Sequence, residues 1–141
     1  MFGYRRGEDT KLGNREILVD TSIIIDYLRK QKKEKALLWK LLNQYECIIS
    51  TVTVFELYSG AKSSEHREAI DDILEFVDII DFDSIQAKIS SDIFQKLKEE
   101  NQLIEFRDIF IASCAISQKL SLVTFNTDHF IRIEELELFK N

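Results

Sequence analysis

Hydrophobic residues along the 141-residue chain follow two patterns, short continuous runs and longer stretches with helical spacing. The short runs are rich in β-branched residues and predict buried strands at 17–20, 47–49, 77–80, 120–124 and 136–139. In the stretches between them, apolar residues recur every three or four positions, as on the buried face of a helix. Strands that alternate with helices form βα units, so we expect an α/β fold with a mostly parallel sheet of about five strands.

Polar residues and glycine at the ends of these stretches predict where several helices begin and end. Ser50 or Thr51 is placed to cap one helix, and Gly60 to end it. Asp83 and Gln86 have the spacing of a capping box. The helix that they open carries a stripe of apolar residues: Ile85, Ile89, Ile93 and Leu97.

The domain organisation is simple. Residues 1–15 are polar and lack periodicity, which predicts a flexible N-terminal arm, and residues 16–141 show no linker or repeat and form one domain. No apolar run approaches the ~18–20 residues of a membrane span, and the N-terminus lacks the apolar core of a signal peptide. We therefore expect a cytoplasmic protein without membrane association.

Composition and charge narrow the function classes. The formal net charge of −6 disfavours broad, non-specific binding of nucleic acid, which needs basic surface. An enzyme whose acidic residues bind cations remains compatible with it. Cys47 and Cys114 lie in apolar segments and are interpreted as core residues of a reduced compartment, since no zinc-ligand spacing is present.

Asp20 is the first candidate for chemistry. The run Ile17-Leu-Val delivers it to the carboxyl end of a predicted strand, where Thr-Ser and a new helix begin. Ligands of open parallel sheets bind at that edge. Capping of the following helix is the structural alternative, and the residues leave both roles open.

Glu56 and Asp108 are the next candidates. Glu56 stands among apolar residues, and a carboxylate is costly to bury unless it is paired or bound to metal; a solvent-facing position is the alternative. Asp108 lies in the first turn of a helix predicted from about Phe106 to Gln118. Interaction with the helix N-terminus would explain its charge. It also heads the apolar face of that helix, so we favour a functional role.

Two further candidates, Asn126 and Asp128, follow the strand predicted at 120–124, although Asn-Thr-Asp is also ordinary turn chemistry. Carboxylates crowded at one point repel each other and shift toward protonation unless a cation neutralises them. Mg²⁺ takes oxygen ligands in octahedral geometry and keeps several waters. It also lowers the pKa of bound water, so no histidine general base is required.

Four segments carry a resemblance to a known family: LVDTSIIIDYL at 18–28, ISTVTVFELYSG at 49–60, RDIFIA at 107–112 and LVTFNTDHF at 122–130. In their order, spacing and context the chain resembles the PIN-domain nucleases, specifically the VapC-like toxins of type II toxin–antitoxin systems, over about residues 16 to 139. The resemblance implies a three-layer α/β/α sandwich. It also implies an endoribonuclease that hydrolyses single-stranded or structured RNA with Mg²⁺ or Mn²⁺, leaving a 5′-phosphate and a 3′-hydroxyl.

Residue by residue, the resemblance implies that Asp20, Glu56 and Asp108 are the three principal acids, which hold the metal and carry catalysis. Ser22 matches a position whose hydroxyl supports the site.

The chain differs from the family pattern at two positions. Phe106 stands where many relatives carry an extra acid, two residues before the third principal one. The fourth acid of the family falls at Asn126 or at His129, with Asp128 between them. The fourth ligand therefore stays open between Asn126 and Asp128, the latter acting directly or through a water.

The resemblance further implies an antitoxin partner, whose C-terminal segment lies over the active site, and a homodimer. A basic cluster suited to phosphate or to an acidic partner comprises Arg29, Lys30, Lys32, Lys33, Lys35 and Lys40. A solvated helix face explains the same residues equally well.

Other classes of protein that this pattern of residues could indicate are compared with the sequence. A phospho-aspartate phosphatase requires a second aspartate where Ser22 stands, and a receiver domain requires a lysine where residues 124–127 offer none, so both are disfavoured. A PIN nuclease of RNA processing and a non-catalytic PIN scaffold remain as alternatives. Metal-dependent RNA cleavage that Asp20→Asn abolishes would exclude the scaffold.

Overall fold

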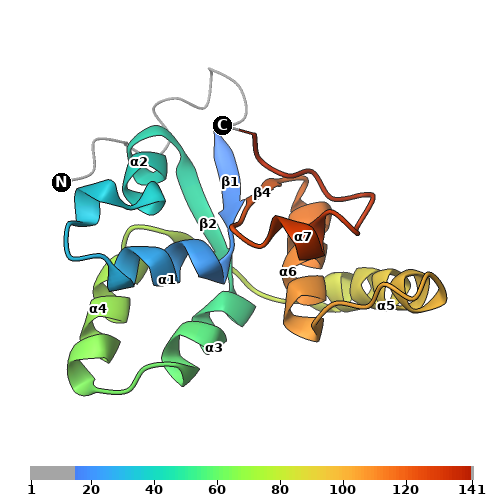
Figure 1. Cartoon of the computed structure of the whole chain (residues 1–141), viewed down its shortest axis with the longest axis horizontal. Helices are drawn as coiled ribbons and strands as arrows, with labels where there is room; N and C mark the ends of the chain where they lie inside the picture. The colour runs from blue at the N-terminus through green and yellow to red at the C-terminus, as the bar shows by residue number, and fades with distance from the viewer. Residues whose placement is uncertain (1–14, 141) are drawn as a thin grey trace.

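A parallel sheet of four strands lies at the centre of residues 15–140, the part of the chain that the computed structural model describes (Figure 1). The strands are β1 (Glu16–Val19), β2 (Glu46–Ser50), β3 (Asp78–Ile80) and β4 (Ser121–Val123), in the order β3-β2-β1-β4. Every pairing between them is parallel. The expected α/β fold is confirmed. The arm predicted for residues 1–15 falls, apart from Arg15, outside the described residues.

Helices cover both faces of this sheet. They are α1 (Thr21–Arg29), the short 3₁₀ helix η2 (Lys33–Lys35), α2 (Leu37–Gln44), α3 (Thr51–Ser59), α4 (Ser64–Leu74), α5 (Ser84–Glu99), α6 (Phe106–Gln118) and α7 (Thr127–Phe130). Two expected N-caps are present. Ser50 accepts a hydrogen bond from the N–H of Val52, and Asp83 accepts one from Gln86. Figure 1 shows α1 to α4 on one side of the sheet and α5 to α7 on the other.

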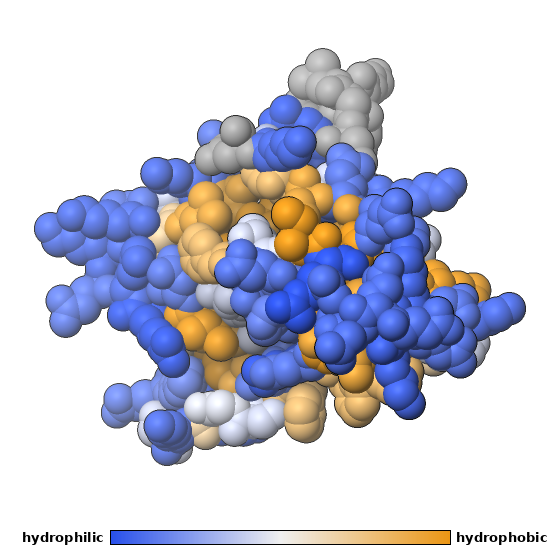
Figure 2. All heavy atoms as spheres, turned by 45° about the vertical axis from the view of Figure 1, so that its right-hand side comes forward, coloured by the Kyte–Doolittle hydropathy of each residue, from blue (hydrophilic) through white to orange (hydrophobic). Residues whose placement is uncertain are grey.

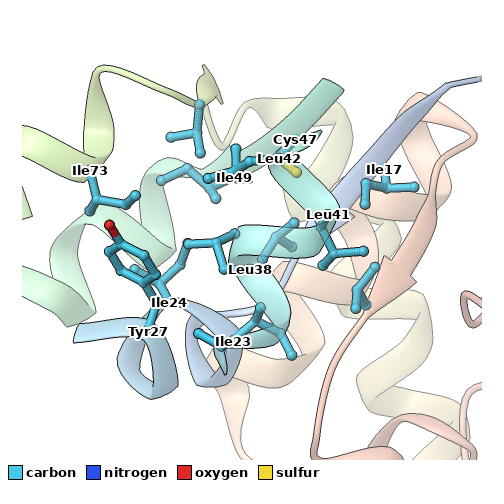
Figure 3. Packing of buried hydrophobic residues seen from close by; sticks show 14 of the residues in the cluster. Ile17, Ile23, Ile24, Tyr27, Leu38, Leu41, Leu42, Cys47, Ile49 and Ile73 are labelled. Atoms are coloured by element: carbon cyan, nitrogen blue, oxygen red, sulfur yellow. The ribbon is translucent and has the colours of Figure 1, made fainter. Parts of the chain in front are cut away.

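The strands build a separate core on each face, because successive side chains of a strand point to opposite sides. On one face, Ile17 and Val19 of β1 and Ile49 of β2 join a buried cluster with Ile23 of α1 and Leu38 of α2 (Figure 3). A fully buried aliphatic side chain of this kind contributes about 1.5–3 kcal/mol of stability. This cluster fixes α1, and with it the residue at the end of β1.

The opposite face holds a second buried cluster. Leu18 of β1 and Leu122 of β4 pack with Ile93 of α5, Ile109 of α6 and Phe130 of α7. The sheet is thus enclosed between two helical layers, as expected of a three-layer α/β/α sandwich.

The fifth predicted strand is wrong. Residues 136–139 meet β4 only at an isolated bridge between Leu138 and Leu122. Two backbone hydrogen bonds join them, from the Leu122 N–H to Glu137 and from the Phe139 N–H to Leu122. The segment runs beside β4 for too short a distance to extend the sheet.

The predicted apolar face of α5 is correct only in its second half. Ile85 is 65% exposed, and the buried positions are Gln86, Ser90, Ile93 and Leu97. The polar pair is buried because each has a partner: the Gln86 amide donates to the Asp81 carbonyl, and the Ser90 hydroxyl bonds Ser113 of α6. Among the described residues, no helix combines the length and apolarity that crossing a membrane requires.

Candidate active site

The three predicted acids meet in one cavity at the carboxyl ends of the strands. Asp20 follows β1, Glu56 lies in the helix that follows β2, and Asp108 lies in the first turn of α6. The cavity has a volume of about 360 Å³. It is lined by Asp20, Thr21, Ser22, Ile25, Glu56, Arg107, Asp108, Phe125 and Asn126.

Asp20 is 5% exposed and occupies the N-cap position of α1, yet its side chain makes no capping hydrogen bond. Its Oδ2 instead accepts from the Ser22 hydroxyl at 2.8 Å and from the Thr124 hydroxyl at 2.7 Å. Its backbone N–H donates to the Val123 carbonyl of β4. The structure therefore excludes the capping role and shows a carboxylate positioned by two hydroxyls.

Glu56 reaches the cavity from α3. Its Oε1 accepts a hydrogen bond from the Thr21 hydroxyl at 2.7 Å, and its Oε2 lies 3.2 Å from the Arg107 guanidinium. Burial, before any other cause, raises the pKa of Glu56. The bond from Thr21 and the charge of Arg107 lower that pKa, while the negative charges of Asp20 and Asp108 raise it.

The Thr21 hydroxyl is itself held by a second hydroxyl. The Oγ1 atoms of Thr21 and Thr53 lie 2.9 Å apart, and Thr53 is fully buried. A hydroxyl carries one hydrogen. Because Thr21 gives its hydrogen to Glu56, Thr53 donates to Thr21. Two consecutive hydrogen bonds, between Thr53 and Thr21 and between Thr21 and Glu56, therefore fix the orientation of the Glu56 carboxylate from the buried core.

Asp108 is buried and turned toward α7. Its Oδ2 lies 2.9 Å from Nδ1 of His129 and 3.5 Å from the side-chain nitrogen of Asn126. Burial is the largest cause that raises the pKa of Asp108. The hydrogen bond from His129 lowers it, and the charge of Asp20 raises it. Nδ1 of His129 also lies 2.8 Å from the side-chain nitrogen of Asn126, so the tautomer of the ring decides whether Nδ1 donates to Asp108 or accepts from Asn126.

The remaining predicted residues differ in their placement. Ser22, the predicted supporting residue, and Asn126, one of the two predicted fourth ligands, both line the cavity. Asp128 is exposed and is absent from the cavity lining, while its neighbour His129 contacts Asp108. The one-turn helix α7, which the hydrophobic pattern does not reveal, decides which of the two faces the site.

Four residues that were not predicted to be metal ligands or catalytic residues take part in this constellation: Thr21, Arg107, Thr124 and His129. Three of them adjoin a candidate residue in the sequence, and Thr124 begins the segment that holds Asn126. Adjacency to a strand end or to an acid was therefore the available signal.

A divalent cation such as Mg²⁺ or Mn²⁺ fits the donor set. Three carboxylates of one cavity repel each other, and the amide of Asn126 adds a further oxygen, which are the ligands that hard divalent cations prefer. In the described part of the chain, no three acidic, histidine or cysteine side chains are already arranged to hold a metal ion. Each acid is turned toward its own hydroxyl, guanidinium or imidazole partner, and metal binding would redirect it.

Comparisons with known proteins identify the family to which the chain is similar. Residues 17–136 match the family model described as "PIN domain". Over 98 residues, the chain is 35% identical to Ribonuclease VapC3 of Methanocaldococcus jannaschii, covering 70% of this chain and 96% of that protein.

Two solved structures share the fold. One is VapBC2 from Rickettsia felis bound to a DNA fragment from its promoter, with 25% identity, 88% of this chain and 97% of that chain covered, and a TM-score of 0.76. The other is a toxin–antitoxin complex from Klebsiella pneumoniae, with 26% identity, coverage of 85% and 94%, and a TM-score of 0.68.

Proposed function

The chain belongs to the PIN domain family, and on that premise we propose that it is a metal-dependent endoribonuclease, the toxin of a toxin–antitoxin pair that acts in the cytoplasm. One observation carries this proposal. Asp20, Glu56 and Asp108 come from three distant segments and line one cavity at the carboxyl ends of the strands. Two buried carboxylates and a partly buried third, which repel one another in one cavity, are suited to cation-assisted hydrolysis.

Asp20, Glu56 and Asp108 are the residues proposed to hold Mg²⁺ or Mn²⁺, with Asn126 as a further oxygen donor. The chemistry that such a cation supplies when bound is activation of a water molecule and stabilisation of negative charge on a phosphoryl group. The expected products are a 5′-phosphate and a 3′-hydroxyl.

The chain's own part in the reaction is orientation. The hydroxyls of Ser22 and Thr124 direct Asp20. Thr21 directs Glu56, and His129 directs Asp108. These contacts restrict the rotamers that each acid can adopt, and binding of the cation would complete the arrangement.

The antitoxin partner is proposed to bind a groove that adjoins the active-site cavity. This groove has a volume of about 450 Å³ and is lined by residues of α1, α3, α4 and the turn between α3 and α4: Ile25, Leu28, Arg29, Glu56, Leu57, Gly60, Ser63, Glu65, His66 and Ala69. It shares Ile25 and Glu56 with the cavity. A peptide segment lying in the groove would therefore reach a proposed metal ligand and block the site.

The predicted basic cluster is only partly free for such a partner. The Lys33 ammonium donates to the carbonyls of Tyr27 and Leu28 in the last turn of α1, while Lys30 pairs with Asp26. Arg29 lines the groove and is the cluster member placed to meet an acidic partner residue.

A homodimer is also proposed, through the side of the molecule that α5 and α6 form. Phe106 is exposed there, and a shallow cavity of about 300 Å³ between the helices is lined by Ala87, Ser90, Ser91, Phe94, Phe106, Ile109 and Phe110. Figure 2 brings this side forward and shows hydrophobic patches among hydrophilic side chains.

Light scattering should give twice the chain mass for the wild type and the single-chain mass for Phe106→Asp. A monomeric wild type would contradict the dimer.

Cleavage of single-stranded RNA in Mg²⁺ or Mn²⁺ tests the function. The wild type, freed of any antitoxin, should cut, and Asp20→Asn should not. Asp128→Asn is the matched control, because it removes an exposed carboxylate that does not line the cavity. Activity in Asp20→Asn, or an inert wild type, would refute the catalytic proposal. Loss of activity in Asp128→Asn would show that the metal ligands are wrongly assigned.

A further inference from the structure

We propose that Phe125 and Arg107 form a nucleotide-binding rim around the active-site cavity, with an RNA base stacked on Phe125 and a backbone phosphate bound by Arg107. The inference rests on the proposed function and specifies how that site holds its substrate. Both residues line the cavity that contains the acids.

Phe125 presents an aromatic ring to solvent beside the acids. It is 55% exposed although it lines the cavity. Its backbone is fixed on both sides: the Phe125 N–H donates to Ser22 at 3.2 Å, and the next N–H, of Asn126, donates to the Thr124 hydroxyl at 2.9 Å. The hydroxyls of Ser22 and Thr124 that accept these bonds also donate to the Asp20 carboxylate. The position of Phe125 is therefore set relative to a catalytic acid.

A stacking surface answers a need of this particular chain. With a net charge of −6, the protein gains little from general attraction to a polyanion. The faces of unpaired bases stack on aromatic side chains whatever the sequence, and this contributes affinity that does not depend on charge. An exposed ring at the mouth of an acidic cavity provides that surface.

Arg107 supplies the matching charge. Among the described residues that line the cavity it is the one lysine or arginine, and its side chain is more than half exposed. Its guanidinium is divided between Glu56 Oε2 at 3.2 Å and Glu105 Oε2 at 2.8 Å. Its planar fork of donors matches phosphate oxygens. A divalent cation that neutralises Glu56 would free one side of that fork for a phosphate next to the acids.

The base contact is tested by RNA binding, followed by fluorescence anisotropy with Mg²⁺ present and an RNA probe that carries cleavage-resistant linkages, so that Asp20 and the metal ligands stay intact. Phe125→Ala should raise the dissociation constant of the RNA complex roughly 5- to 150-fold, the range for loss of one stacked base. Phe125→Tyr should retain affinity because it keeps the ring. Phe55→Ala is the matched control, since Phe55 is 72% exposed and does not line the cavity. A 2-aminopurine probe in the RNA should be quenched on binding, and Phe125→Ala should remove the quenching.

The phosphate contact has a different signature. Arg107→Gln should reduce the slope of log affinity against log salt by about 0.7, the value for one phosphate of a single strand, whereas Phe125→Ala should leave the slope unchanged. Arg67→Gln is the control, because Arg67 is exposed on α4 and stacks on Tyr58 away from the cavity.

The outcomes separate this inference from the proposed function. If the wild type cleaves RNA but Phe125→Ala and Arg107→Gln bind and cleave as the wild type does, the rim is refuted and the nuclease stands. If Phe125→Ala weakens only the complex with the antitoxin, Phe125 is a protein contact and the rim is likewise refuted. If the wild type does not cleave RNA at all, the proposed function fails first.

Discussion

Replacing Thr21 with valine should uncouple Glu56 from the core. Valine has the same shape as threonine, so the change creates no cavity and removes only the hydroxyl. Two hydrogen bonds are lost, the 2.7 Å bond to Glu56 and the 2.9 Å bond from Thr53. A bond to a charged group contributes about 1.5–3 kcal/mol, and a buried hydroxyl left without a partner costs about 1–3 kcal/mol.

Because Glu56 retains Arg107 and some contact with water, we expect the lower part of this range, about 3 kcal/mol in total. For a chain of this length, about 4 °C of melting temperature corresponds to 1 kcal/mol, so Thr21→Val should melt about 12 °C below the wild type. Differential scanning calorimetry in EDTA measures the effect. RNA cleavage should fall at least about tenfold, the effect of 1.4 kcal/mol lost from the transition state.

A double variant makes the reasoning refutable. Thr53 is fully buried, so Thr21→Val leaves its hydroxyl unpaired, and adding Thr53→Val removes that hydroxyl. The double variant should therefore be more stable than Thr21→Val alone by about 1 kcal/mol. If the two losses simply add, the proposed chain of hydroxyls is wrong. Ser113→Ala is the control: it breaks a buried hydroxyl pair outside the site and should lower stability without changing activity per folded molecule.

Three further predictions follow from the site and the core. Mn²⁺ at about 100 times its dissociation constant should stabilise the wild type by about 2.7 kcal/mol in thermal melting, and Asp20→Asn should lose most of this gain; equal stabilisation of both would contradict the metal assignment. Burial raises the pKa of Glu56 and of Asp108, so the stability that these groups contribute is complete below their unfolded pKa values and is lost as the pH rises through the folded ones. In urea denaturation with EDTA, Asp108→Asn should therefore lose less stability than the wild type between about pH 4 and pH 7, and a larger loss would reverse the assigned sign. Burial also raises the pKa of Cys47 to about 12 and that of Cys114 to about 11. Both thiols should resist a disulfide reagent at about pH 8 and react in urea, whereas rapid reaction of the native protein would show that they are accessible.

Much of the fold is predictable because the hydrophobic pattern records burial directly. The helix predicted from Phe106 to Gln118 has the same bounds in the structure, and the caps at Ser50 and Asp83 are local signals that need no tertiary information. Residues 136–139 show the limit. Their pattern is that of a strand, yet strand formation depends on how long a neighbour runs alongside, which the pattern does not record.

The acids of the site are predictable and their partners are not. Strand ends of a parallel sheet converge, so Asp20 and the helices after neighbouring strands can be placed from topology. The choice between Asp128 and His129 depends on the rotation of α7. Phe130 is fully buried, and a residue two positions away on a helix points to nearly the opposite side, which turns Asp128 toward solvent. His129, between them, faces Asp108.

The hydrogen bond from Thr124 to Asp20 joins residues 104 positions apart, and this separation has a consequence for synthesis. A ribosome makes Asp20, Glu56 and Asp108 before it makes β4 and the hydroxyl that holds Asp20. β4 also pairs with β1 and accepts the N–H of Asp20. A nascent chain that stalls before β4 therefore carries every acid without the strand that arranges them. Translation products that end before β4 should therefore be harmless, and toxicity should begin only once β4 has been made.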